Sequence, residues 1–277
     1  MPSRFIVPPS SCDAHIHIYD DRFPTQPPGA AIVQHATVAE YKKVQQRLGT
    51  ARVVIVTPGG YRTDNRVTLD AIEQLGVDRA RGVAVLHPDV DDSTLNQLHE
   101  GGVRGLRFTL FNPATSVTSV DMIEPLAQRI HRLGWHVQLH MLPTQIVQNR
   151  ELIDRLPGTI VFDHFARLLP VDDATQEACT AVSRWLADGR AWIKFSAPYL
   201  TRTASDPAAI QDLASHFLGV APDRIVWGSD WPHPTEQPDN VPDDEQLLAC
   251  LAQWAPSEAQ RHRILVDNPA SLYGFGQ

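Results

Sequence analysis

Two histidines two residues apart are the first candidates for chemistry in this chain. His15 and His17 lie in the apolar segment CDAHIHIYD, and on a β-strand such a spacing points both side chains to one face. Neutral imidazole nitrogens bind metals such as zinc, and buried imidazoles need polar partners. A single His-x-His pair is as often incidental as functional, so its meaning depends on what lies beside it.

Other titratable residues end short apolar runs elsewhere in the chain. Asp230 ends the run RIVWGSD, Asp163 and His164 end TIVFDH, and His140 ends WHVQLH, with Gln138 on the same face. A carboxylate at such a point can ligate a metal or take a proton from water, although it can also cap a helix or form an ion pair. A lone histidine at a strand end is more often structural. The coincidence of several such residues favours a common site.

These residues need a scaffold, and one pattern recurs along the chain. A short apolar run ends in polar, Gly or Pro residues and is followed by an amphipathic stretch. Eight runs begin at Cys12, Arg52, Arg81, Val103, Trp135, Thr159, Ala191 and Arg224. Since a strand with its crossover helix takes about 30 residues, this alternation predicts parallel strands covered by helices.

Eight strand–helix units without a linker predict an α/β fold, a single (β/α)8 TIM barrel over residues 1–277. An open doubly wound sheet is less favoured, because no strand end carries a GxGxxG or P-loop motif. In a barrel the C-terminal strand ends face the active site. The fold therefore gathers five residues at one rim: His15, His17, His140, His164 and Asp230.

The segments between the runs carry helix signals. Thr37 and Glu40 form a capping-box pattern, and Gly49 follows as a stop signal. Apolar residues at spacings of three and four predict a helix within 120–134. Two further helical segments, 243–254 and 257–275, follow the eighth strand.

Composition excludes several classes of protein. With 24 Lys and Arg against 32 Asp and Glu, the net charge of −8 is unfavourable for general nucleic-acid binding. No apolar run approaches the roughly 20 residues of a membrane span. Three cysteines without a CxxC motif predict free thiols in a reducing, cytoplasmic environment. A homo-oligomer is compatible with the sequence, which does not determine the oligomeric state.

The segments around these residues resemble a known family. DAHIHIYD, FDHFAR, VWGSDWPHP and DNPASLYGF are similar to the amidohydrolase-2 branch of the amidohydrolase superfamily, from Ser11 to Phe275. FPTQPPG, TDNRVTL and IKFSAPY resemble the group of 2-pyrone-4,6-dicarboxylate lactonases and D-galactarolactone isomerases. The resemblance implies attack of activated water on an ester, lactone or amide carbonyl, or proton transfer in a lactone isomerase.

The resemblance also implies roles for the catalytic residues. His15 and His17 match the first-strand pair, His164 the sixth-strand histidine and Asp230 the base that takes a proton from water. A metal, if bound, is expected at His15, His17, His140 and Asp230, a ligand set suited to one Zn²⁺ or another divalent ion. The resembled lactonases work without metal, so metal-free catalysis stays open. Arg107 occupies the position of the bridging Lys or Glu, which argues against two metals.

Four cations are expected around the mouth of the site: Arg107, Arg167, Lys194 and Arg202. They could clamp a substrate carboxylate, since arginine binds carboxylates in a bidentate way. The alternative is that they pair at the surface with Asp163, Asp172 and Asp173. Arg107 is the strongest candidate, because its strand position points inward. Tyr61 and Tyr199 are candidates for binding a substrate oxygen.

The sequence thus predicts a hydrolase of a small, anionic, carboxylated lactone. The alternatives are an isomerase of sugar-acid lactones, a zinc-dependent decarboxylase, and a barrel that binds without catalysing. Hydrolysis releases acid, isomerisation does not, and decarboxylation releases CO₂, so the products separate these hypotheses.

Overall fold

Eight parallel strands form one sheet in the order β1 to β8 in the computed structural model, which describes residues 6–26, 36–168, 172–201, 207–237 and 239–276. The strands are β1 Cys12–Ile16, β2 Arg52–Val56, β3 Ala80–Ala84, β4 Val103–Thr109, β5 His136–His140, β6 Ile160–Phe162, β7 Ala191–Phe195 and β8 Ile225–Trp227. Each begins within one residue of its predicted start.

The sheet curls until its first and last strands meet. Ile16 forms an isolated parallel bridge with Trp231. The amide of His17 donates to the Trp231 carbonyl at 2.7 Å, and the amide of Asp230 donates to the His15 carbonyl at 2.9 Å. The predicted (β/α)8 barrel is confirmed. Its seam closes where two candidate histidines meet the candidate base.

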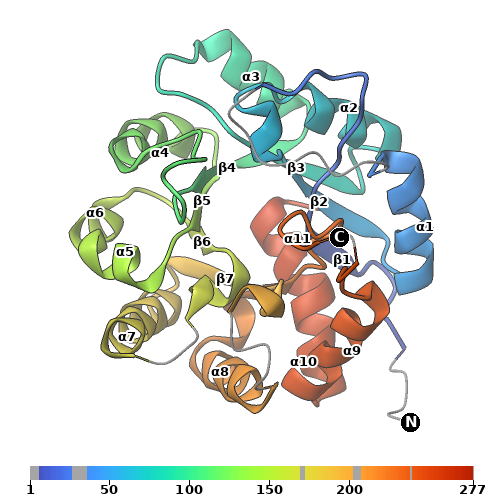
Figure 1. Cartoon of the computed structure of the whole chain (residues 1–277), viewed down its shortest axis with the longest axis vertical. Helices are drawn as coiled ribbons and strands as arrows, with labels where there is room; N and C mark the ends of the chain where they lie inside the picture. Colours follow the sequence, from blue (N-terminus) through green and yellow to red (C-terminus); the bar gives the residue numbers. More distant parts are fainter. Residues whose placement is uncertain (1–5, 27–35, 169–171, 202–206, 238, 277) are drawn as a thin grey trace.

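Helices surround the barrel as an outer ring (Figure 1). They are α1 Val38–Leu48, α2 Arg66–Leu75, α3 Asp92–Glu100, α4 Ile123–His131, α5 Pro143–Gln148, α6 Arg150–Arg155, α7 Asp173–Ala187, α8 Pro207–Val220, α9 Asp244–Trp254, α10 Glu258–His262 and α11 Asn268–Tyr273. Single turns also occur at η1 Gly59–Tyr61, η2 Val120–Met122, η3 His164–Arg167, η4 Pro198–Thr201, η5 Pro222–Arg224 and the π-helical η6 Arg263–Asp267. None of the described helices is long and apolar enough to cross a membrane.

The predicted helix boundaries follow their capping residues. The Thr37 side chain accepts from the Glu40 amide at the start of α1, and Gly49 ends this helix in the left-handed region at φ 76°. The predicted helix within 120–134 divides into η2 and α4. These local signals were therefore sufficient to place the helices between the strands.

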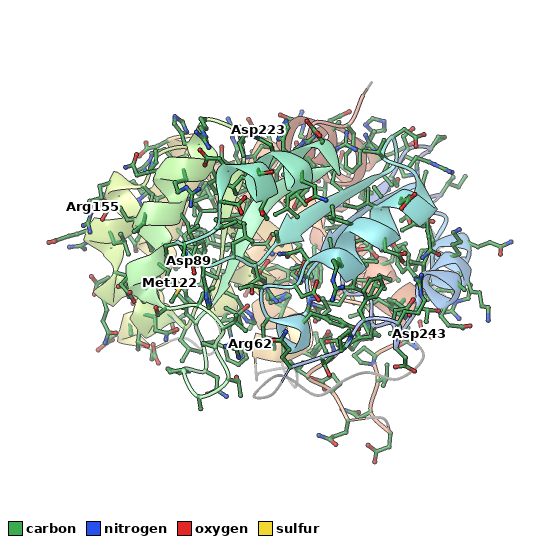
Figure 2. All side chains as sticks on the ribbon, turned by 90° about the horizontal axis from the view of Figure 1, so that it is seen from above. Arg62, Asp89, Met122, Arg155, Asp223 and Asp243 are labelled. Carbon is green, nitrogen blue, oxygen red and sulfur yellow. The ribbon has the colours of Figure 1, made fainter. Side chains whose placement is uncertain are left out.

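Alternating side chains in each strand separate two apolar cores. In β2, Val53 and Ile55 pack towards the helices, whereas Val54 and Val56 belong to the cluster inside the barrel. The register of β1 against β2 shifts between Asp13 and Ile16. In the view from above, Asp223, before β8, lies at the upper edge and Arg62, after β2, in the lower part (Figure 2).

The N-terminal end of the barrel is closed by the last described residues of the chain. Tyr273, the last residue of α11, and Phe275 belong to the interior cluster. The guanidinium groups of Arg52 and Arg81 lie 5.0 and 4.7 Å from the centre of the Phe275 ring. This end of the barrel is a packed floor, so access to the interior comes from the other end.

A glycine allows the barrel seam to close tightly. A Cβ atom added at Gly228, just after β8, would lie 2.6 Å from the Cβ and 2.7 Å from the backbone nitrogen of His15. Contacts this short do not occur between real atoms of this kind, so a larger residue would push the two strands apart. Because Gly228 has no side chain, His15 can pack directly against the end of β8.

Candidate active site

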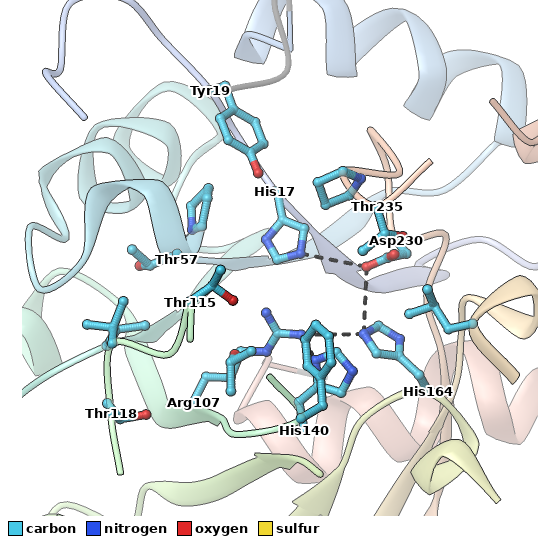
Figure 3. Close-up of a pocket in the computed structure, with 18 residues that line it drawn as sticks. His17, Tyr19, Thr57, Arg107, Thr115, Thr118, His140, His164, Asp230 and Thr235 are labelled. Atoms are coloured by element: carbon cyan, nitrogen blue, oxygen red, sulfur yellow. Dashed lines mark hydrogen bonds and ion pairs between the residues drawn. The ribbon is translucent and has the colours of Figure 1, made fainter. Parts of the chain in front are cut away.

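A cavity of about 110 Å³ opens at the C-terminal ends of the strands (Figure 3). The polar residues of its wall include His17, Thr57, Arg107, His140, His164 and Asp230. Four of the five titratable residues expected at this rim line the cavity. The fifth, His15, lies directly behind His17.

Asp230 is the centre of the arrangement. Its Oδ1 atom lies 3.5 Å from His15 Nε2, 3.6 Å from His17 Nε2 and 3.9 Å from His164 Nε2. The residue follows β8 in the left-handed region at φ 66°, which is strained for a residue with a side chain. It is only 2% exposed. The end of β8 thus directs one carboxylate oxygen towards three imidazoles.

Hydrogen bonds determine how two of these histidines face Asp230. His17 Nδ1 lies 2.8 Å from the carbonyl oxygen of Val56, which only accepts, so Nδ1 carries the hydrogen. Its Nε2 atom then faces Asp230 at the cavity. His164 Nε2 lies 3.4 Å from Arg107 Nη2, which only donates, so Nε2 accepts and Nδ1 carries the hydrogen towards Ser196 Oγ at 2.9 Å.

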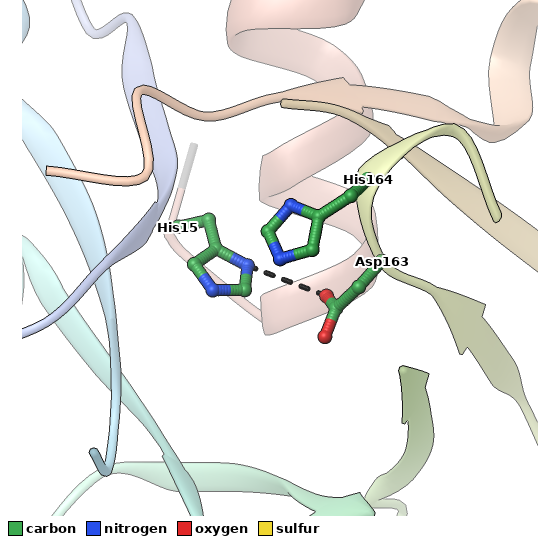
Figure 4. A group of neighbouring side chains, drawn as sticks. All are labelled: His15, Asp163 and His164. Atoms are coloured by element: carbon green, nitrogen blue, oxygen red, sulfur yellow. Dashed lines mark ion pairs between the residues drawn. The ribbon is translucent and has the colours of Figure 1, made fainter. Parts of the chain in front are cut away.

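Asp163 lies beneath these groups and connects them. Its Oδ2 accepts from Arg107 Nε at 2.8 Å and from Gln138 Nε2 at 3.1 Å. Its Oδ1 lies 3.3 Å from His15 Nδ1, as Figure 4 shows. His15 Nδ1 also lies 3.2 Å from Lys194 Nζ, a donor, and Asp163 Oδ1 has no hydrogen-bond partner among the described atoms. Asp163 therefore lies within ion-pair distance of His15, Arg107 and Lys194 and joins them in one buried charge cluster.

Both carboxylates are ionised at neutral pH. Burial alone would raise the pKa of Asp230, but the neighbouring His164, His17 and His15 outweigh it and hold the pKa well below its usual value. Burial likewise opposes ionisation of Asp163, and Arg107, His15 and Lys194 hold its pKa well below the usual value. Burial lowers the pKa of His164 to about 4, with Asp230 opposing the shift. The site thus holds an ionised Asp230 beside a neutral His164.

His140 is separate from this cluster. Its Nδ1 atom is 3.1 Å from Arg107 Nη2, and its Nε2 atom is 2.9 Å from Arg167 Nη1. Phe111 packs against the His140 ring at 4.5 Å between centroids and against the Arg167 guanidinium at 4.7 Å. Both ring nitrogens therefore face guanidinium groups, so His140 is a weaker candidate for a metal ligand than the sequence indicated.

The donor atoms fit a divalent metal, although with a different ligand set from the predicted one. Among the described residues, two groups have ligand atoms close enough to share an ion: His15, His17 and Asp230, and His15, Asp163 and His164. In the first group the distances are 3.3, 3.5 and 3.6 Å. Ligands about 2.0–2.1 Å from a tetrahedral zinc are separated by roughly 3.4 Å. His140 belongs to neither group.

Comparison with known proteins places this site in a family. The model of the Amidohydrolase family matches residues 12–275. The chain belongs to this family. A 4-sulfomuconolactone hydrolase from Hydrogenophaga intermedia is 33% identical over 99% of this chain and 91% of its own, and a 2-pyrone-4,6-dicarboxylate hydrolase from Comamonas testosteroni is 31% identical over 98% and 92%.

Two further relatives extend the comparison. A D-galactarolactone isomerase from Agrobacterium fabrum is 27% identical over 96% of this chain and 91% of its own. An apo crystal structure from Agrobacterium tumefaciens superposes with a TM-score of 0.86 at 25% identity, covering 97% of both chains. The resemblance inferred from the motifs is therefore confirmed across the whole barrel.

The cations of this amidohydrolase do not all reach the cavity. Arg107 lines it and pairs with Asp163, in the interior rather than at the surface. Lys194 is fully buried below, where its Nζ donates to the Ala14 carbonyl at 3.0 Å and lies 3.2 Å from His15 Nδ1. Burial lowers the pKa of Lys194 to about 8. Arg202 lies outside the described residues.

The two candidate tyrosines also lie away from the cavity wall. The Tyr61 hydroxyl bonds to the backbone amide and carbonyl of Asp20. The Tyr199 hydroxyl donates to Asp230 Oδ2 at 2.7 Å and lies 2.9 Å from His233 Nδ1. Sequence reasoning assigned no role to His233, although this polar residue between two prolines, three positions after Asp230, was an available signal.

Proposed function

We propose that this amidohydrolase is a lactone hydrolase that acts on a small, anionic, carboxylated lactone. The observation that carries the proposal is the ionised Asp230, whose Oδ1 atom lies among three imidazoles at the edge of the cavity. The names of two relatives, both hydrolases of anionic lactones, support the substrate class.

The reaction needs a base for water and donors for the carbonyl oxygen. Asp230 takes a proton from water as the oxygen attacks the lactone carbonyl, and later delivers that proton to the leaving ring oxygen. Arg107, which lines the cavity beside His164, donates to the carbonyl oxygen and stabilises the negative charge that develops on it. Removal of one such donor typically costs about 10²–10³ in rate.

A divalent metal at this site would be held by His15, His17 and Asp230. When bound, such a metal lowers the pKa of water to about 7. Metal analysis of the purified protein decides whether catalysis uses it. About one metal per chain, lost in His17→Asn but retained in His140→Ala, supports the three-residue site. A content below roughly a tenth, with activity resistant to chelators, supports the metal-free reaction.

Substrate recognition is proposed to depend on the cationic side of the cavity. Arg107 lines the wall, and Arg167 lies behind His140, so a substrate carboxylate would meet positive charge there. The wall also carries hydroxyl groups, from Thr57, Thr109, Thr115, Thr118 and Thr235. These groups suit the oxygen atoms of a small lactone.

The proposal is tested by acid release in weak buffer with a pH indicator. The substrates are 2-pyrone-4,6-dicarboxylate, 4-sulfomuconolactone and D-galactarolactone. We expect acid release from at least one lactone by the wild type, and a kcat about 10²–10⁴ lower for Asp230→Asn. Full activity of Asp230→Asn would contradict the assignment of the base.

Isomerisation is the second candidate, because a D-galactarolactone isomerase is among the relatives. The same base would then take a proton from a substrate hydroxyl, and the product would be a rearranged lactone without acid release. Release of CO₂ would instead favour decarboxylation, and no turnover of any substrate would favour a binding protein. Cytoplasmic location, a single domain over 1–277 and homo-oligomerisation stay predictions.

A further inference from the structure

The two oxygens of Asp230 have different surroundings. Oδ1 faces the three imidazoles at the cavity. Oδ2 faces the opposite direction and accepts from the Tyr199 hydroxyl at 2.7 Å. Tyr199 lies in η4, the turn that follows β7, and is absent from the cavity wall. Its hydroxyl therefore reaches the base from behind.

The Tyr199 hydroxyl is itself held by a second pair of buried residues. His233 Nδ1 lies 2.9 Å from the Tyr199 oxygen, and His233 Nε2 lies 3.1 Å from Asp244 Oδ1. His233 is 1% exposed and Asp244 is 6% exposed. Asp244 begins α9, so the chain of contacts connects the base to the outer ring of helices.

The number of available hydrogens determines which group donates in each of these hydrogen bonds. The Tyr199 hydroxyl donates its single hydrogen to Asp230 Oδ2. The Tyr199 oxygen then accepts a hydrogen from His233 Nδ1. His233 Nε2 faces the carboxylate of Asp244, which accepts as well. His233 thus links the Tyr199 oxygen to the Asp244 carboxylate.

We propose that Tyr199, held by His233 and Asp244, is a positioning residue that holds the Asp230 carboxylate with Oδ1 at the cavity. Without the hydroxyl, the carboxylate can rotate about its last side-chain bond, so that Oδ1 is no longer fixed between His15 and His17. Small displacements of a base reduce the rate strongly because proton transfer requires close alignment. This inference rests on the proposed function only for its kinetic consequence.

The first test compares Tyr199→Phe with a matched control, Tyr273→Phe. The control also removes one tyrosine hydroxyl, which is buried at the barrel floor and has no hydrogen-bond partner among the described atoms. With 2-pyrone-4,6-dicarboxylate as substrate, we expect Tyr199→Phe to lower kcat at least about tenfold with KM within about twofold, because the side chain is outside the cavity wall. Tyr273→Phe keeps both constants.

The opposite kinetic pattern overturns the inference. A raised KM with unchanged kcat would mean that Tyr199 binds substrate, and an unchanged kcat and KM would mean that the hydroxyl has no role in catalysis. Thermal unfolding of both variants shows whether a loss of kcat merely follows a loss of stability. A large stability loss confined to Tyr199→Phe would assign the hydroxyl a structural role instead.

The role of His233 is tested by a conservative replacement. The amide of Asn can donate to the Tyr199 oxygen from about the position of His233 Nδ1, whereas Leu cannot donate. We expect the kcat of His233→Asn to lie between those of the wild type and His233→Leu. Equal kcat values for the two variants would contradict the proposed hydrogen bond.

A crystallographic readout does not depend on the substrate. Crystal structures of the wild type and Tyr199→Phe should show Asp230 Oδ1 between His15 and His17 only in the wild type. An unchanged carboxylate in Tyr199→Phe would overturn the positioning role, even if the wild type hydrolyses lactones. A rotated carboxylate, with no lactone turned over by the wild type, would instead support positioning and reject the proposed substrate.

Discussion

The two ends of the barrel both bury charged side chains, but they satisfy them in different ways. At the N-terminal end, Arg81 donates to the main-chain carbonyls of Tyr273 and Gly274, and Arg52 donates to that of Val266. At the C-terminal end, Arg107 and Asp163 pair with each other and with histidines. Main-chain carbonyls keep their charge and position during a reaction, whereas side chains can exchange protons and partners.

This difference separates structural charge from charge available for chemistry. Arginines that donate to the backbone close the floor and also stack on Phe275. The charges at the other end depend on one another, so the loss of one leaves others buried without a partner. Substitutions at the two ends should therefore lower the free energy of unfolding by different amounts.

The largest expected effect is that of Arg107→Met, which leaves Asp163 without its guanidinium partner. Breaking a buried ion pair by removing one partner costs about 3–5 kcal/mol, so we expect a loss of this size in the free energy of unfolding in urea at pH 7. Arg81→Met, which removes hydrogen bonds to carbonyls and the contact with the Phe275 ring, should cost about 2 kcal/mol. Equal losses in the free energy of unfolding for the two variants would contradict the difference between the two ends of the barrel.

The next largest effect is a loss of folding stability at low pH, caused by His164. Burial lowers the pKa of His164 from 6.5 to about 4 in the folded state. Between these values the unfolded chain binds a proton that the folded chain excludes, so stability falls as the pH falls from 6.5 to 4. The shift corresponds to about 3 kcal/mol. His164→Gln should reduce this loss in urea unfolding measured at pH 6.5, 5.5 and 4.5.

The comparison between wild type and variant is needed because another group acts in the opposite direction. Burial raises the pKa of Asp13 to about 7, with hydrogen bonds from Ser229 opposing the shift. The folded state therefore binds a proton more readily at Asp13, which favours folding as the pH falls from 7 towards 4. Asp13 is present in both proteins, so their difference isolates His164. Identical pH profiles would contradict a buried neutral His164.

The smallest expected effect is at the floor. Phe275→Leu keeps an apolar side chain but removes the ring that lies against Arg52 and Arg81. Each such contact contributes about 0.5–1 kcal/mol, so the free energy of unfolding should fall by about 1 kcal/mol while kcat stays unchanged. A change in kcat without a change in stability would mean that the two ends of the barrel are coupled.

The fold was predictable because its signals are local and repeated. Each apolar run begins within one residue of an observed strand, and Thr37 and Gly49 cap the first helix as expected. The cluster of His15, His17, His164 and Asp230 was also predictable, since the C-terminal ends of parallel strands meet at one rim.

How far along the barrel axis each side chain lies, and which groups it contacts there, was not predictable from these local signals. Lys194 lies on β7 as expected, but its position along the strand places it below His15 rather than at the mouth. His140 reaches the rim, yet two arginines from β4 and η3 occupy both its nitrogens. Such contacts depend on strand stagger and on side chains from distant segments, which a pattern of residue types does not contain.

Gly228 restricts how the specificity of this enzyme can change. The seam between β8 and β1 has no room for even one methyl group, so a larger substrate cannot be accommodated by widening the barrel at that point without displacing His15 and Asp230. Variation must instead come from the loop positions of the wall, such as Thr115 and Leu200. A library for altered substrate range should therefore randomise these loops and leave the seam intact.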